Sequence, residues 1–213
     1  MIFFIPCYDS ATEGNLAVAV QILPDACHAL LSDRATRAGL LESLASTGVP
    51  LFCMSHGRPD RLLAQGGETA LSGVDGPALG RRPVFAFACH TASELGEATA
   101  KKGAFWWGYT GRVTAPDSTE TVLPLFAEIF AYIRDAFPRA DSAASCRDVL
   151  TRISELCHEA EARVDDLLGT GDTLDVGSIY LCLLQLWQRL RVWVPGGREP
   201  LIHPQAPPPN LLI

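Results

Sequence analysis

The chain has 213 residues, of which 48% are hydrophobic and 19% charged, a balance typical of one globular domain with or without an appendage. Its 17 Lys and Arg side chains against 24 Asp and Glu give a net charge of −7 without a basic cluster, which argues against a nucleic-acid partner. No basic leader precedes the first apolar residues, and no apolar run approaches the roughly 20 residues of a membrane-spanning helix, so we expect neither a signal peptide nor a membrane partner.

The first 137 residues alternate short apolar runs with helical patterns. Strands are predicted at 2–6, 26–31, 49–55, 84–88 and 104–109. Helices are predicted at 33–45, 91–102 and 117–137, while 14–23 fits either a helix or a strand. This alternation favours parallel strands joined by right-handed crossovers. We therefore predict an α/β fold, a three-layer αβα sandwich with a mostly parallel sheet, for residues 1–137.

Polar residues that can cap helices precede three of the predicted helices. Asp33 and Asp117 each stand where a helical pattern starts. Thr91 and Glu94 have the spacing of a capping box, which predicts a helix that begins two residues after Cys89.

Residues 138–200 are predicted to be a helical extension that packs on the core or completes it. It contains helices at about 142–168 and 178–191 and a possible edge strand in "RVWVPGG". The tail, 201–213, is rich in proline and is expected to be extended or disordered. An apolar stripe in the extension is assigned to the core, with docking of a regulatory partner or a second copy as the alternative; it comprises Leu181, Leu184, Trp187 and Leu190.

The seven cysteines indicate a reducing compartment. Their number is odd, their spacing fits no small disulfide scaffold, and several lie inside apolar runs. We therefore expect free thiols and a cytoplasmic protein. "CH" pairs occur at Cys27, Cys89 and Cys157, but no pair of ligands has the spacing typical of a zinc site, so no metal and no cofactor are expected.

Two apolar runs end on residues that can take part in acyl transfer. "LFCMSHG" ends at His56 and Gly57, and "VFAFACH" ends at Cys89 and His90. Neighbouring parallel strands lie about 4.8 Å apart, and ligands of such sheets bind at the carboxyl ends of the strands. His56 and Cys89 are therefore expected to face one crevice, whereas His90 points elsewhere.

This pair predicts a cysteine nucleophile with a histidine partner. A free thiol is only slightly ionised at neutral pH, and both the His56 imidazole and the start of a helix after Cys89 would favour the thiolate. Cys89 would attack a carbonyl, His56 would deliver a proton to the leaving amine, and the N–H groups of Gly57 and Cys89 would form the oxyanion hole. Because glycine has no side chain, substrate could approach Gly57 closely.

The segments around this pair resemble the caspase-like cysteine peptidases, the clan of caspases, metacaspases, gingipains and separase, and most of all the CHAT-type domains. The similar segments cover about residues 26–137 and are "LLSDRATRAGLLESLA", "SHG", "ETALSGVDGPALGRRP", "FACHTAS", "KKGAFWWGYTGRV" and "APDSTETVLPLFAEIFAYI". The chain departs from the caspase pattern Q-A-C-x-G, because His90 follows the cysteine.

The resemblance implies an endopeptidase with His56 and Cys89 as its dyad, no metal in the chemistry, and a protein or peptide substrate. Bacterial relatives that stand alone often act in defence or programmed cell death. In several relatives the S1 pocket is formed after the first strand and after the fifth, which makes Asp9 and Asp117 candidates for binding a basic P1 side chain. Trp106, Trp107 and Tyr109 are further candidates for a pocket wall.

Two other functions compete with the peptidase. A catalytically silent relative would use the same crevice to bind a protein segment. A small-molecule cysteine amidase would use the same dyad in a closed pocket, whereas the loops at 57–83 and 110–118 suit an extended peptide better.

Overall fold

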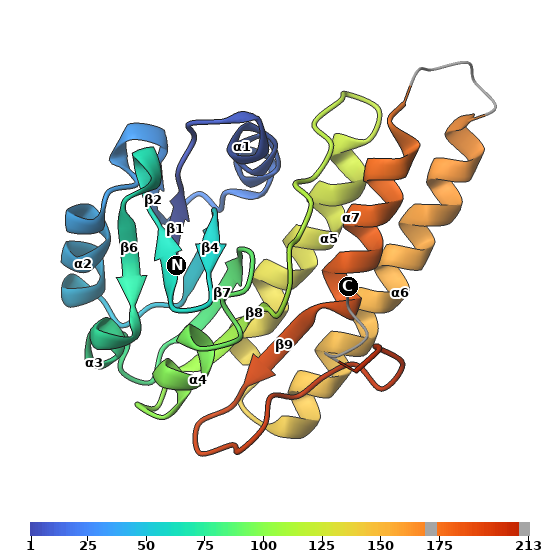
Figure 1. Ribbon diagram of the computed structural model, residues 1–213. Coiled ribbons are helices and arrows are strands. Elements are labelled where there is room, and N and C mark those ends of the chain that lie inside the picture. Colours follow the sequence, from blue (N-terminus) through green and yellow to red (C-terminus); the bar gives the residue numbers. More distant parts are fainter. Residues whose placement is uncertain (169–173, 209–213) are drawn as a thin grey trace.

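A computed structural model describes residues 1–168 and 174–208 of the chain (Figure 1). It is an α/β protein built on a six-stranded mixed sheet with the strand order β2-β1-β3-β7-β8-β9. The strands of this sheet are β1 (Ile2–Ile5), β2 (His28–Leu31), β3 (Leu51–Met54), β7 (Pro83–Phe87), β8 (Phe105–Tyr109) and β9 (Leu190–Trp193). The first five pair in parallel, and β9 pairs antiparallel with β8 at the edge.

Helices cover both faces of the sheet. They are α1 (Ser10–Ile22), α2 (Arg37–Ser46), α3 (Gly76–Leu79), α4 (Leu95–Ala100), α5 (Leu123–Ala136), α6 (Ala143–Leu168) and α7 (Val176–Gln188). Short 3₁₀ helices lie at Ser32–Arg34, Gln65–Gly67, Gly73–Asp75 and Phe137–Arg139. Segment 14–23, which the sequence left open, belongs to the helix α1.

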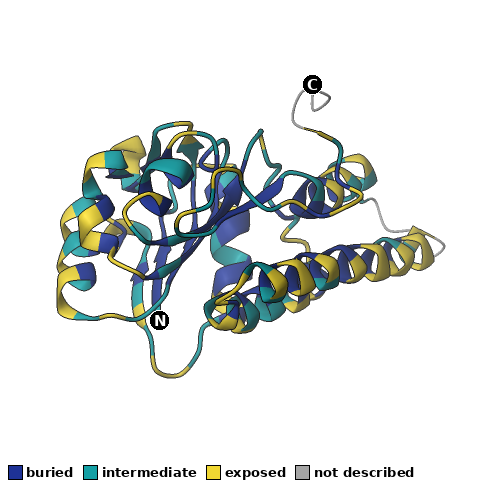
Figure 2. Cartoon of the chain, turned by 90° about the horizontal axis from the view of Figure 1, so that it is seen from below, coloured by how far each residue is buried: buried dark blue, intermediate teal, exposed yellow. Residues whose placement is uncertain are grey.

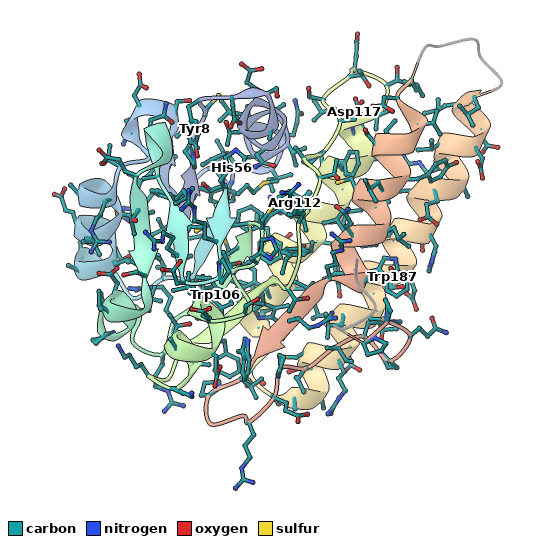
Figure 3. All side chains as sticks on the ribbon, in the orientation of Figure 1. Tyr8, His56, Trp106, Arg112, Asp117 and Trp187 are labelled. Atoms are coloured by element: carbon teal, nitrogen blue, oxygen red, sulfur yellow. The ribbon has the colours of Figure 1, made fainter. Side chains whose placement is uncertain are left out.

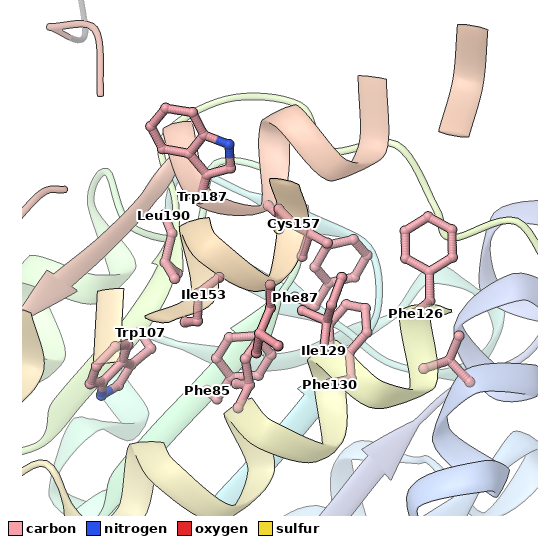
Figure 4. Close-up of a cluster of buried hydrophobic side chains, with 14 of the residues drawn as sticks. Phe85, Phe87, Trp107, Phe126, Ile129, Phe130, Ile153, Cys157, Trp187 and Leu190 are labelled. Carbon is pink, nitrogen blue, oxygen red and sulfur yellow. The ribbon is translucent and has the colours of Figure 1, made fainter. Parts of the chain in front are cut away.

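Alternation along the strands divides the apolar residues between two cores. One face, with Phe52, Phe85 and Phe87, packs against α1, α5, α6 and α7 (Figure 4). The other face, with Phe4 and Trp106, packs against α2, α3 and α4. Every residue of β1 is buried, as a central strand covered on both faces requires (Figure 2). This arrangement is compatible with the predicted three-layer sandwich.

The Gly- and Pro-rich segment after β3 forms a second, smaller sheet. Its antiparallel strands are β4 (Gly57–Arg58), β5 (Arg61–Leu63) and β6 (Thr69–Ser72). The short apolar segment at 69–71 lies in β6. The sheet matters for function because it begins immediately after His56.

The C-terminal part of the chain completes the main sheet and one of its cores. The predicted edge strand is confirmed as β9, and α6 and α7 pack over the same face of the sheet as α5. The described part of the Pro-rich tail folds back instead of extending freely, since Leu201 bridges to Val192 and His203 is buried. Residues 209–213 of the predicted tail lie outside the described residues.

Two predictions about these elements are wrong. Thr36, not Asp33, caps α2, and its hydroxyl accepts from the Gly39 N–H. Leu181 and Leu184 were assigned to the core but are 44% and 39% exposed, whereas Trp187 and Leu190 of the same stripe are buried in the core.

No helix among the described residues is long and apolar enough to cross a membrane.

Candidate active site

His56 and Cys89 follow neighbouring strands of the sheet. In the β3–β7 ladder Met54 pairs with Phe87, and the Ser55 N–H extends the ladder by donating to the Phe87 carbonyl at 3.0 Å. Each site residue stands two positions beyond its paired strand end, so both lie at the carboxyl edge of the sheet. Together they line one small cavity of about 20 Å³. His56 and Cys89 therefore line one cavity, although no hydrogen bond joins the imidazole to the thiol of these two described residues.

Asp9 is the hydrogen-bond partner of the imidazole. Its Oδ2 lies 2.7 Å from His56 Nε2, with both side chains partly exposed. Its Oδ1 accepts from the Thr12 N–H at 2.9 Å and caps α1 in a capping box. Partial burial raises the pKa of Asp9, but the hydrogen bonds from Thr12 and His56 outweigh it and hold that pKa below its ordinary value. An ionised carboxylate only accepts, so in the neutral imidazole Nε2 carries the proton and Nδ1 has the lone pair.

Gln65, which follows β5, holds the loop that carries Asp9 through two hydrogen bonds. The side-chain amide of Gln65 accepts from the Cys7 N–H and donates to the Cys7 carbonyl, both at 2.8 Å. Tyr8 then lies against the imidazole, with ring centroids 5.7 Å apart, and Figure 3 shows Tyr8 and His56 as neighbours. These contacts fix the ring of His56 from two sides.

The Cys89 thiol meets the main chain of the loop after β8. Its Sγ lies 3.3 Å from the Val113 N–H, which donates to it, and 3.7 Å from the Val113 carbonyl. A backbone N–H on the sulfur can stabilise negative charge there. Cys89 is half-buried, whereas burial raises the pKa of Cys53 well above the usual range and that of Cys146 to about 11. Those two thiols are correspondingly inert.

The turn after Cys89 differs from the predicted capping box. Thr91 does not cap a helix; its hydroxyl donates back to the Ala88 carbonyl at 3.1 Å. The N–H groups of Glu94 and Leu95 donate to the Pro59 carbonyl, and α4 starts only at Leu95. Cys89 therefore does not stand at a helix start, and no helix dipole favours its thiolate.

His90 holds an unusual backbone conformation. Its φ is +62°, in the left-handed region that few residues other than glycine adopt, and its N–H donates to the Gly111 carbonyl at 3.0 Å. The chain therefore turns sharply directly after Cys89. Backbone strain of this kind clusters at functional sites, where it fixes the direction of a reactive side chain.

A steric constraint that is not evident from the sequence requires glycine at position 57. A Cβ at this position would overlap the Cys89 carbonyl oxygen and would lie 2.5 Å from Thr91 Cγ2. What approaches Gly57 closely is thus the turn that carries the thiol, rather than substrate. The Leu63 N–H donates to the His56 carbonyl, so Gly57 and Leu62 form a non-hydrogen-bonded pair and the Gly57 N–H points away from β5.

We expect Gly57→Ala to lower the free energy of unfolding by about 1–3 kcal/mol, because a methyl group would be forced against main chain. It would also push His56 away from Cys89. Urea unfolding measures the loss of stability. Gly48→Ala is the matched control, since a Cβ there meets nothing within 4 Å; equal behaviour of the two variants would contradict the contact.

The remaining predicted site residues are not assembled into this crevice. Asp117 accepts from the Thr119 N–H at 2.8 Å and stands six residues before Leu123, where α5 begins, so it is not the N-cap of that helix. It lies out along the loop toward α7 (Figure 3). The candidates for a pocket wall, Trp106, Trp107 and Tyr109, are fully buried and belong to the core.

Sequence reasoning missed two parts of the site. Asp9 was expected in a specificity pocket rather than on the imidazole, although the Asp9–Thr12 spacing does signal a helix start that would expose its second oxygen. Asn15, on α1, also lines the cavity with His56 and Cys89. Nothing in the local sequence distinguishes Asn15 from an ordinary helix residue.

Other places in the described structure offer less chemistry. A larger hollow of about 380 Å³ lies at the amino ends of the strands, beside Met1, His28 and Val49, on the edge opposite His56 and Cys89. Within residues 1–168 and 174–208, no three His, Cys, Asp or Glu side chains are grouped closely enough to hold a metal ion.

No family model, no curated protein and no solved structure matches this chain. What the protein does must therefore be inferred from its own residues and their geometry.

Proposed function

We propose that the protein is a caspase-like cysteine endopeptidase with Cys89 as nucleophile and His56 as general acid and base. The observation that carries this proposal is one crevice at the carboxyl edge of the sheet, lined by both side chains, with Asp9 hydrogen-bonded to the imidazole. A cysteine, a histidine and a group that orients the histidine are the parts that a cysteine nucleophile requires.

Acylation follows from these roles. The Cys89 proton passes to His56 Nδ1, and the sulfur attacks the carbonyl carbon of the scissile peptide, forming a C–S bond and an oxyanion. The N–H of Gly57, which points away from β5, and the N–H of Cys89 are the donors assigned to that oxyanion. The oxyanion collapses, the C–N bond breaks, and the imidazolium gives its proton to the leaving amine.

In deacylation His56 acts as the base toward water. His56 Nδ1 takes a proton from water, whose oxygen attacks the thioester carbon. The C–S bond then breaks, the product acid leaves, and the proton returns to the sulfur. Asp9 stays ionised throughout and balances the charge of the imidazolium, as expected for a carboxylate whose pKa is lowered.

A protein or peptide substrate is supported by the openness of the reactive edge. The His56 side chain is 34% exposed and Cys89 is half-buried, so the dyad is more open than the closed pocket expected of a small-molecule amidase. The sequence resemblance to CHAT-type domains and the mostly parallel sheet support a caspase-like peptidase, and through it a role in bacterial defence or cell death. The silent binding module remains the competing function.

The test is a peptide library incubated with wild type and Cys89→Ala and read by mass spectrometry. The endopeptidase predicts internal cleavage products that appear with wild type and are missing with the variant. Equal inertness of both proteins, together with failure of an acyloxymethyl ketone to label Cys89, favours the binding module. Release of ammonia from small amides without peptide cleavage favours the amidase.

Asp9→Asn is expected to reduce kcat/KM by between about tenfold and a hundredfold while it preserves the fold. The amide can still cap α1, but it removes the charge beside His56 and can donate to Nε2, which favours the wrong tautomer. Asp117→Asn is the matched control and should stay within about twofold of wild type. A larger loss in Asp117→Asn than in Asp9→Asn would instead support the carboxylate pair as a receptor for a basic P1 side chain.

Asp9→Asn should also differ from wild type in its stability at acidic pH. Because the pKa of Asp9 is lowered in the folded state, its contribution to stability is complete above its ordinary pKa of about 4 and is lost as the pH falls through the folded-state value. Wild type should therefore lose more stability than Asp9→Asn between about pH 4 and pH 2. Parallel stability curves for the two proteins would contradict the hydrogen bonding assigned to Asp9.

A further inference from the structure

Asn15 is a buried polar side chain without a complete set of partners. It lies in the second turn of α1, is 4% exposed, and lines the same cavity as His56 and Cys89. Within the described chain, its Oδ1 is buried and accepts no hydrogen bond. A buried acceptor left unpaired costs stability, and in native proteins a ligand or an ordered water often supplies the missing hydrogen bond.

The cavity next to Asn15 is small and otherwise mostly apolar. Its walls include Ala11, Phe87, Val113 and Ala115, and its volume is about 20 Å³. A space of roughly 10–15 Å³ holds one water, so this cavity accepts a group of one or two heavy atoms as it stands. Asn15 lines that space, and its buried Oδ1 has no hydrogen-bond donor among the described residues.

The loop that closes the cavity is held in place from two sides. On one side Gly14 of α1 lies against Pro116, where a Cβ would come within 2.6 Å of the Pro116 carbonyl oxygen. On the other side, two residues of α7 bind the main chain of Thr114. The Thr114 N–H donates to buried Gln185 at 2.6 Å, and the Thr114 carbonyl accepts from the Cys182 thiol at 3.1 Å. Enlarging the cavity would break these contacts.

We propose that this cavity is the S1 pocket, that it accepts glycine, alanine or serine, and that Asn15 selects serine. The serine hydroxyl would donate to Asn15 Oδ1, which satisfies the buried acceptor. A basic P1 side chain is excluded by size, and the Asp9 carboxylate that might have received it is bonded to His56. This inference rests on the proposed peptidase and names its substrate class.

The experiment compares peptides that differ only in P1, which is Ser, Ala or Arg, on wild type, Asn15→Leu and Gln21→Leu. Wild type should cleave after Ser about tenfold faster than after Ala, the worth of one hydrogen bond, and should leave Arg uncut. Asn15→Leu should lose the Ser-over-Ala preference while it still cleaves after Ala, which shows that it is folded. Gln21→Leu changes an exposed residue of the same helix and should behave as wild type.

Acyloxymethyl ketones with the same three P1 residues keep the test independent of how the variants fold. Faster labelling of wild-type Cys89 by the Ser reagent than by the Arg reagent supports the inference. Cleavage or labelling that is fastest with Arg overturns it and leaves the peptidase standing, and so does an unchanged Ser-to-Ala ratio in Asn15→Leu. If no reagent labels Cys89 and no peptide is cut, the proposed peptidase falls and this inference with it.

Discussion

Cys89→Ala is expected to reduce kcat/KM for peptide cleavage by at least about a thousandfold, with the fold unchanged. In the proposed mechanism the sulfur forms the bond to substrate, and no other group that lines the cavity replaces it. The other lining groups are an amide, a serine already bonded to the Leu63 carbonyl, an imidazole and apolar side chains. The loss would be seen in initial rates on any peptide that wild type cuts.

The fold should survive because Cys89 is half-buried and its only partner is the main chain of Val113 among the described residues. Cys27→Ala, which alters another half-buried thiol at the opposite edge of the sheet, is the matched control and should retain full activity. Loss of activity in Cys27→Ala, or its retention in Cys89→Ala, would assign the nucleophile elsewhere.

His56→Gln is expected to lower kcat/KM by about 10²–10⁴-fold, the range for loss of a general acid and base. It should also slow the alkylation of Cys89 by iodoacetamide at neutral pH, because only the thiolate reacts and the imidazole is the base proposed to form it.

His90→Asn separates this effect from the other histidine at the site. Asparagine tolerates the left-handed backbone that His90 adopts, so the turn after Cys89 is retained. Its alkylation profile and its activity should stay close to wild type. If His90→Asn slowed alkylation as much as His56→Gln, the base would be the adjacent residue.

The parts of the fold that local patterns determine were predictable. Apolar runs predict the five parallel strands, and helical periodicity predicts the long helices. Once the strand ends are known, so are the positions of His56 and Cys89 directly after them. The adjacency of those two strands follows from the α/β pattern, and it places His56 and Cys89 at one edge of the sheet.

The parts set by contacts between distant segments were not predictable. The turn after Cys89 looked like a capping box, but the Pro59 carbonyl takes the N–H groups that would have started the helix. Asp9 reaches His56 because Gln65, far along the chain, holds the main chain of Cys7. No pattern near Asp9 or Asn15 encodes these partners, so roles that depend on them emerge only from the fold.

The most direct measurement is a peptide map of the protein after reaction with a peptidyl acyloxymethyl ketone. The central claim predicts one modified residue, Cys89, in wild type, and strong loss of that adduct in His56→Gln. An adduct on Cys7 or Cys27, or a Cys89 adduct that forms equally fast without His56, would contradict it.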